Sequence, residues 1–182
     1  MSTVVVEHRG GAGHGPTALW CRPPDGWATT TRGRDTVLWD PRIAGSFRPN
    51  LLVRVHDVAA ALDLDALLAM VDDELEDLER AGAHVERRGR TTVAVDGGTG
   101  IAALASFDTT DPPTAAAVRV LQLHVFVEAD GTEGPPAADA RPVFHIVATW
   151  PVTDVDAAGW GDALVALVTS AEVRRGRPST RR

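Results

Sequence analysis

Three histidines lie in segments whose alternation of apolar and polar residues is typical of β-strands: His56, His124 and His145. Imidazole can bind a metal ion or transfer a proton near neutral pH, so a histidine cluster would indicate metal-dependent or acid–base chemistry. The three residues follow no ligand spacing along the chain, and their side chains can meet only if their strands are neighbours in one sheet. The sequence leaves that point open. It favours half-exposed histidines on a sheet face, and we expect no catalytic residue, no metal site and no cofactor.

A cluster of acids lies in the segment DDELEDLE, residues 72–79, which carries six carboxylates. Paired carboxylates can bind calcium or hydrolyse glycosides, but no calcium-binding loop with a central glycine is present, and a helix surface is not a cleft. Two interpretations remain. The simpler one is a solvated helix face, and the other is a docking surface for a basic protein partner. The candidate partner-binding residues are Asp72, Asp73, Glu76, Asp77 and Glu79.

Other kinds of chemistry find little support in the sequence. No Gly-x-Ser-x-Gly motif indicates a hydrolase, and all 18 basic residues are arginine, which removes lysine chemistry. The segment DGGTG, residues 96–100, lies between two predicted strands, so it predicts a β-turn and not a phosphate loop. Cys21 follows Trp20 on a predicted strand, where a buried and inert thiol is expected.

The composition excludes two classes of partner. A net charge of −7 argues against a nucleic-acid-binding protein, which needs a basic face to meet phosphates. No apolar run approaches the ~18 residues of a membrane span, so no membrane insertion is expected. No basic region followed by an apolar core marks a signal peptide. The single cysteine, Cys21, allows no internal disulfide, and together these features predict a cytoplasmic protein.

The strongest helical pattern covers residues 63–81. Asp63 is placed to cap its first turn, and Gly82 can supply the left-handed residue that ends it. A second helix is predicted to begin near Thr153, where Thr153 and Asp156 resemble a capping box. The apolar stripe of the first helix consists of Leu64, Leu67, Leu68, Val71, Leu75 and Leu78. The stripe of the second consists of Trp160, Leu164, Leu167 and Val168.

Strands are predicted on both sides of the first helix, in hairpin-like succession. The connections 95–101 and 107–117 are too short for helical crossovers, so these neighbours should be antiparallel. The predicted fold class is therefore α+β, with a twisted antiparallel sheet and helices packed on it. The predicted strands are 17–22, two strands of a hairpin that turns at Gly33 within 28–40, then 51–56, 91–95, 101–107, 117–128 and 143–150.

The chain is predicted to contain one domain of ordinary size. Residues 1–16 are rich in glycine and predict a flexible arm with at most a brief strand. Residues 17–173 form the domain. Residues 174–182 are basic and contain no apolar side chain, which predicts a disordered tail.

Two short motifs give this order of elements a family likeness. The first motif is a Pro-x-x-Trp turn from Pro24 to Trp27, and the second is a Phe-x-Pro-Asn strand entry from Phe47 to Asn50. Both precede the long helix, the run of strands and the closing helix. Over residues 17–171 this pattern resembles the Mog/PsbP-like superfamily, and within it the actinobacterial LpqN-type proteins. The resemblance implies an α/β/α sandwich around a central antiparallel sheet. It also implies a family without a common catalytic centre, whose members act mainly by binding other proteins.

The resemblance leaves three functional hypotheses. The first is a non-enzymatic protein-binding or adaptor domain, and the second is a small-molecule or metal-dependent enzyme that uses the sheet-face histidines. The third is an accessory protein linked to secretion or the cell envelope. LpqN-type proteins are often lipoproteins, but no apolar segment precedes Cys21, so the likeness does not carry an envelope location. A deep pocket beside His124 and His145 would favour the enzyme, whereas a flat groove would favour the adaptor.

Overall fold

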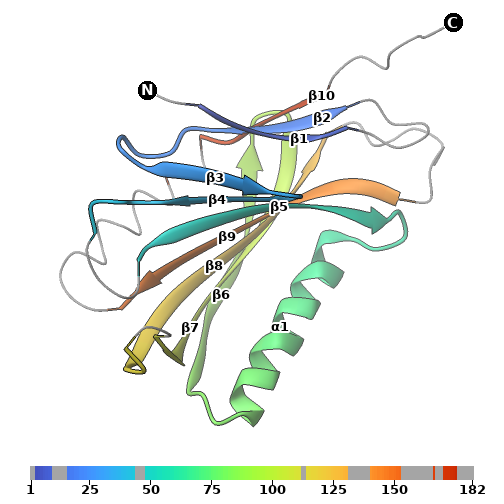
Figure 1. Cartoon of the computed structure of the whole chain (residues 1–182). Coiled ribbons are helices and arrows are strands. Elements are labelled where there is room, and N and C mark those ends of the chain that lie inside the picture. The colour runs from blue at the N-terminus through green and yellow to red at the C-terminus, as the bar shows by residue number, and fades with distance from the viewer. Residues whose placement is uncertain are drawn as a thin grey trace, which may run out of the picture.

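The computed structural model describes residues 3–9, 16–43, 48–111, 114–130, 140–152, 166 and 170–175. Two antiparallel sheets and one helix make up the described elements (Figure 1). The strands are β1 Val4–His8, β2 Thr17–Cys21, β3 Ala28–Arg32, β4 Asp35–Trp39, β5 Asn50–Ala59, β6 Val85–Val95, β7 Gly98–Thr110, β8 Ala117–Ala129, β9 Ala140–Pro151 and β10 Glu172–Arg175, and helix α1 is Leu64–Arg80.

The seven-stranded sheet forms the middle layer. Its order is β3-β4-β5-β9-β8-β7-β6, and the three-stranded sheet has the order β1-β2-β10. Figure 1 shows α1 on one face of the large sheet and the small sheet on the other. Strand β8 serves both faces, because Val125 and Val127 join the core between the sheets while Phe126 joins the core beneath α1. That double burial is why its sequence reads as a nearly continuous apolar run.

The α+β class with an antiparallel sheet is confirmed by this topology. The sandwich with helices on both sides stays a prediction. The second helix was placed near Thr153, and its stripe, Trp160, Leu164, Leu167 and Val168, lies outside the described residues. Among the described residues beyond β9, only Ala166 is helical. No helix in the described part of the chain is long and apolar enough to cross a membrane.

Helix α1 forms where its apolar stripe and its caps predict it. The Oδ1 atom of Asp63 accepts a hydrogen bond from the backbone N–H of Ala66 at 2.8 Å, which satisfies one of the free donors of the first turn. Gly82 has φ +95°, and its N–H donates to the carbonyl of Glu79 at 2.9 Å. The side chains that the helix buries are Leu67, Leu68, Val71 and Leu75.

Several strands are longer than the sequence predicts. The predicted strand 91–95 is the end of β6, which begins at Val85 and pairs with β7 through a register shift between Arg87 and Gly89. Most side chains of β6 are exposed on both faces, so no apolar alternation marks it. Pairing with β7 holds it in the sheet instead. Strands β5 and β7 also extend beyond the predicted 51–56 and 101–107.

Both ends of the chain contribute strands where looser segments were expected. Residues 4–8 of the predicted arm form β1, which pairs with β2, and Val6 is buried against the core. Arg174 and Arg175 of the predicted tail belong to β10, which pairs with the other edge of β2. One buried valine in each strand, Val6 or Val173, anchors it. The division of the chain into arm, domain and tail otherwise stays a prediction.

The segment DGGTG forms the predicted turn and also receives β10. Gly97 has φ +72°, which glycine adopts without a steric penalty. A Cβ atom on Gly97 would lie 2.3 Å from the carbonyl oxygen of Val173. The backbone N–H of Val173 donates to the carbonyl of Asp96 at 2.8 Å. The glycine therefore allows the small sheet to approach the end of the large one.

Candidate functional site

The three strand histidines meet on the face of the large sheet that carries α1. Strand β9 lies between β5 and β8, so His145 has Arg54 opposite on one side and Phe126 opposite on the other. The ring centroid of His145 lies 5.6 Å from that of His56 and 5.3 Å from that of His124. The structure therefore joins three side chains whose proximity the sequence left open.

A chain of hydrogen bonds fixes two of these imidazoles. The amide of Gln122 donates from Nε2 to the hydroxyl of Thr149 at 3.2 Å, so its Oε1 atom faces the Nε2 atom of His124 at 2.7 Å. Oε1 can only accept, so His124 carries its proton on Nε2. Its Nδ1 atom is then the acceptor for the Nε2–H of His145, 3.1 Å away. Both rings are neutral in this arrangement.

Burial keeps the cluster neutral. Loss of solvent lowers the pKa of His124 to about 4. The pKa of His145 is lowered to about 3, first by burial and then by the charges of His124, His56 and Arg54. Burial also lowers the pKa of His56, and Arg54 adds to the effect. A base this weak accepts protons poorly near neutral pH, and its conjugate acid is almost absent there.

A cleft of about 460 Å³ opens between α1 and strands β5, β8 and β9, and all three histidines line it. Leu62 and Met70 also line it, although 42% and 59% of their surfaces are exposed. They are two of the four large hydrophobic side chains exposed among the described residues. Both therefore lie at the mouth of the cleft. Its apolar walls are Leu52, Val58, Leu67, Val71, Phe126 and Val147.

One polar atom of the cleft has no hydrogen-bond partner within the described ranges. The Nε2 atom of His56 is buried, and no donor or acceptor reaches it. A buried and unpaired imidazole nitrogen is costly, so such an atom in a cleft wall offers a hydrogen-bonding position to an occupant.

The loop that carries Leu62 is held in place by Arg141. The guanidinium NH1 of Arg141 donates to the carbonyl of Leu62 at 2.6 Å, and its Nε donates to Glu128 at 2.7 Å. The connection from β5 to α1 is thereby tied to β9 and β8. One wall of the cleft mouth is therefore positioned by the sheet itself.

Arginines engage four of the five acids proposed for partner binding. Arg90 and Arg87 of β6 pair with Asp72, and Arg87 also pairs with Glu79 at 2.9 Å. The hydrogen bond from Arg87 lowers the pKa of Glu79. Within the helix, Arg80 pairs with both Glu76 and Asp77, and Asp73 makes no ion pair with any described residue. A role of Asp72, Asp73, Glu76, Asp77 and Glu79 in partner binding stays a prediction.

These acids do not surround the histidine cleft. Asp72 and Glu76 line a neighbouring cavity of about 300 Å³, on the flank of α1 that faces β6, and this cavity shares Val71 and His124 with the cleft. The acid of α1 that lines the histidine cleft is Glu74, one turn after Met70 on the same flank of the helix. The sequence interpretation missed Glu74, Met70 and Leu62. Met70 gave a usable signal, because an apolar residue that lies off the buried stripe is exposed.

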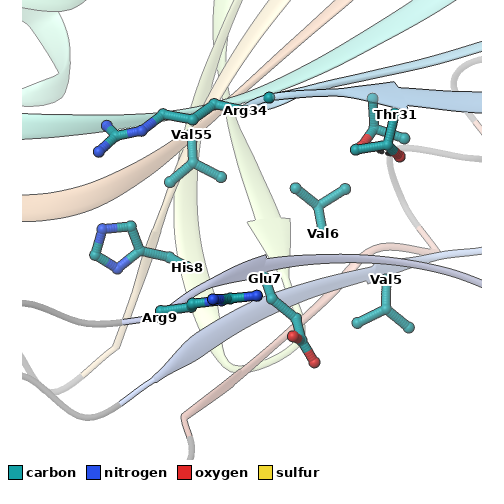
Figure 2. A pocket seen from close by; sticks show the side chains of 10 residues that line it. Val5, Val6, Glu7, His8, Arg9, Thr31, Arg34 and Val55 are labelled. Atoms are coloured by element: carbon teal, nitrogen blue, oxygen red, sulfur yellow. Dashed lines mark hydrogen bonds between the residues drawn. The ribbon is translucent and has the colours of Figure 1, made fainter.

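A second cavity, of about 550 Å³, lies between β1 and strands β3 to β5. Figure 2 shows Val6 and Val55 pointing toward one another across it, with His8 beside them. The Oδ1 atom of Asp57 lies 2.7 Å from Nε2 of His8, and its Oδ2 accepts from Arg34 at 2.8 Å. These contacts tie β1 to β5, so the charged groups of this cavity have a structural role.

The ionisable groups of the described ranges form no metal centre. No group of three or more His, Cys, Asp or Glu side chains there is arranged to hold a metal ion. Cys21 is buried, and burial raises the pKa of its thiol to about 11, as expected for an inert cysteine.

Comparison with known proteins gives structural matches only. No family model matches the sequence, and no curated protein matches it. LpqN of Mycobacterium tuberculosis, a protein involved in cell envelope biogenesis, has a TM-score of 0.61 at 14% identity over 95% of this chain and 92% of its own. The Ran-binding protein Mog1p of Saccharomyces cerevisiae has a TM-score of 0.52 at 16% identity, over 94% of this chain and 95% of its own.

The PsbP protein of the cyanobacterium Synechocystis also matches, with a TM-score of 0.54 at 11% identity over 93% of this chain and 92% of its own. Similarity at these identities shows the fold alone. The chain has a Mog1/PsbP-like fold, as its sequence motifs indicated.

Proposed function

We propose that the chain is a non-enzymatic binding domain that holds a protein partner and acts as an adaptor. The observation that carries the proposal is the cleft beside α1, whose mouth exposes Leu62 and Met70 to solvent. Apolar side chains at the border of an apolar cleft favour contact with another molecule. The histidines inside it are neutral and two of them are bonded to each other, which suits a binding wall.

The chemistry of the lining residues supports binding over catalysis. The pKa values of His124 and His145 lie well below neutral pH, outside the range in which a general acid or base is efficient. No serine, threonine or cysteine is among the described residues that line the cleft. Of its two carboxylates, Asp57 is already paired with Arg34 and His8.

The structural relatives point the same way. Mog1p is described as a Ran-binding protein, so one protein of this fold binds another protein. LpqN is involved in cell envelope biogenesis, which supports the third hypothesis of an envelope-linked accessory role. A cytoplasmic location remains part of our proposal on the basis of composition alone. Fractionation of the native cells tests it, since recovery with the envelope would favour the accessory role.

A second candidate function is a small-molecule enzyme. The observation in its favour is the cleft itself, because a pocket beside His124 and His145 is the feature expected of the enzyme in the second hypothesis. Its volume of about 460 Å³ falls within the ~300–1,000 Å³ of ligand sites. An enzyme would retain or turn over a small substrate without a protein partner. That difference separates the two candidates experimentally.

Photo-crosslinking in the native cells tests the proposal. A benzophenone amino acid is placed at Met70 in the cleft mouth, at Thr30 on the exposed edge strand β3, and at Glu76 on the opposite flank of α1. The adaptor hypothesis expects one protein to be captured reproducibly from at least one position, and to bind again when both proteins are purified. Failure at all three positions, together with a small molecule retained in native mass spectrometry, would favour the enzyme.

A further inference from the structure

We infer that the cleft between α1 and the sheet receives an apolar side chain of a basic peptide segment, presented by the protein partner. This inference rests on the proposed protein-binding function. It adds the place of contact and the chemistry of the segment that enters. Three features of the cleft carry it: its apolar walls, the sign of the charge at its rim, and one unpaired polar atom.

The apolar walls select an apolar anchor. Six aliphatic or aromatic residues form them, and Leu62 and Met70 extend the apolar surface to the mouth. A space of about 460 Å³ between such walls accommodates one or two large side chains. An apolar side chain that enters covers these walls and removes their apolar surface from water.

The rim is acidic on the flank that borders this cleft. Helix α1 carries seven acids and a single arginine, Arg80. On the flank toward β6, Arg87 and Arg90 offset its charge. On the cleft flank, Glu74 is exposed and makes no ion pair with any described residue. Arg54 faces the cleft from β5, but its guanidinium is bound at 2.7 and 2.8 Å by both carboxylate oxygens of Asp35, which offset its charge. The hydrogen bond to Asp35 is the main cause of the raised pKa of Arg54, and Glu74 adds to the effect.

This distribution predicts the charge of the segment. Asp73, next to Glu74 at the exposed side of the helix, is likewise without an ion pair among the described residues. An arginine or lysine beside the apolar anchor would meet Glu74 at the rim, and the exposed carboxylate of Asp73 would add to the negative charge there. An acidic segment would meet the same two charges unfavourably, so the rim discriminates between peptides of opposite charge.

The unpaired atom suits a peptide backbone. His56 lines the cleft, and its Nε2 atom is buried without a hydrogen-bond partner among the described residues, so an occupant reaches this nitrogen after a small rotation of the imidazole. A backbone N–H or carbonyl next to the anchor can satisfy this nitrogen in one of its two tautomers. A purely apolar ligand would leave it unpaired.

Nuclear magnetic resonance with matched peptides tests the inference. The chain contains two methionines, so the methyl signal of Met70 is simple to assign, and the imidazole signal of His56 reports the inner wall. The probe is the capped peptide Arg-Arg-Phe-Arg-Arg. The controls are Glu-Glu-Phe-Glu-Glu and Arg-Arg-Ser-Arg-Arg. We expect the probe to shift both signals and to bind at least about tenfold more tightly than either control.

Variants locate the contact. Met70→Gln and Glu74→Gln change exposed side chains, and each should weaken binding of the probe several-fold. Glu76→Gln is the matched control, because it removes the same charge from the opposite flank of α1 and should leave the affinity unchanged. An equal effect of Glu74→Gln and Glu76→Gln would show nonspecific charge attraction and overturn the inference.

Other occupants give different results. The first alternative is a small apolar ligand, and its probe is octyl glucoside below its micelle concentration. If octyl glucoside binds more tightly than any peptide, the inference is overturned in favour of such a ligand. A dimer in ultracentrifugation that Met70→Gln abolishes would overturn it in favour of a second copy of this chain. If no peptide binds while crosslinking from Thr30 or Glu76 still captures a partner, the inference fails and the proposed function stands.

Discussion

The Nε2 atom of His145 lies 3.1 Å from the Nδ1 atom of His124, on neighbouring strands of the large sheet. The bond requires His145 to donate and His124 to accept, because the other nitrogen of His124 faces the Oε1 atom of Gln122. Protonation of His124 at Nδ1 would place two N–H groups against each other unless His145 moved its own proton to Nδ1. The pair is therefore built to stay neutral, and this has measurable consequences.

Stability should fall as the pH is lowered from 6.5 to 5. An unfolded histidine binds a proton near pH 6.5, whereas burial lowers the pKa of folded His124 to about 4 and that of His145 to about 3. The unfolded state therefore binds more protons throughout this range, so the free energy of unfolding rises with pH. Each histidine accounts for roughly 2 kcal/mol between pH 6.5 and 5. Urea denaturation at the two pH values measures the loss.

The matched variant is His124→Gln with His145→Gln, whose free energy of unfolding should change much less over the same range. Carboxylates with a lowered pKa, such as Asp35 beside Arg54, lose their contribution only at more acidic pH. An equally steep pH dependence in the variant and the parent protein would contradict the assignment to these histidines.

Protein purified without an affinity tag should contain no stoichiometric zinc, iron, nickel or copper. The facing nitrogens of His124 and His145 bind each other, and the second nitrogen of His124 faces Gln122, so the ring lone pairs are not directed at a common point. Metal analysis of the purified protein measures this. Near-unit occupancy that disappears in the His124→Ala, His145→Ala variant would revive the metal-dependent enzyme.

Gly97→Ala should destabilise the fold more than Gly33→Ala. Both glycines have positive φ, +72° and +62°, so each substitution carries a backbone cost of about 1 kcal/mol or more. At Gly33 the new methyl group meets nothing within 4 Å, whereas at Gly97 it would lie 2.3 Å from the carbonyl oxygen of Val173. Gly97→Ala must displace β10, so we expect it to lower the free energy of unfolding by at least about 2 kcal/mol. Equal losses in denaturant titrations would show that β10 does not press on the turn.

The sequence predicts α1 to within one residue at each end, because stripe and caps are local signals that agree. Strand β8 is predicted nearly as well. Strand β10 is missed, and β1 is expected only as a brief strand within a flexible arm, since each is held by pairing with β2 and by one buried valine, among glycines or arginines that favour disorder. Their formation depends on contacts between distant parts of the chain, which no local pattern contains.

The candidate site is predicted in part. Period two places His124 with Gln122 on one strand face, and this pair is hydrogen-bonded in the structure. The cluster also needs β9 between β5 and β8, an order that follows from pairing across the whole chain. The sequence does not distinguish Glu74 from its neighbours, because it lies within a run of acids. Arginines on β6 distinguish its two flanks only after folding.

The last prediction concerns the acidic face of α1. It distinguishes acids that pair within the helix or not at all from acids that pair with arginines of β6. The variant Asp73→Asn, Glu76→Gln, Asp77→Asn removes acids that pair only within the helix or not at all, so stability should change by less than about 1 kcal/mol. The variant Asp72→Asn, Glu79→Gln leaves Arg87 and Arg90 without their partners across the sheet and should be the less stable of the two. Thermal and urea unfolding of both variants measure the difference.

The same pair of variants tests the face in binding. If Asp73, Glu76 and Asp77 steer a basic partner, the triple variant should capture less of it, and wild-type binding should weaken as salt rises from about 0.05 to 0.5 M, because the Debye length shrinks over that range. The Asp72, Glu79 variant should lose less binding, since arginines already neutralise both acids. Capture that is unchanged at every salt concentration would remove the acidic face from consideration. The same result would also contradict the acidic rim that we infer for the cleft, because Asp73 is one of its two charges, and only the apolar anchor beside Met70 would remain as a contact.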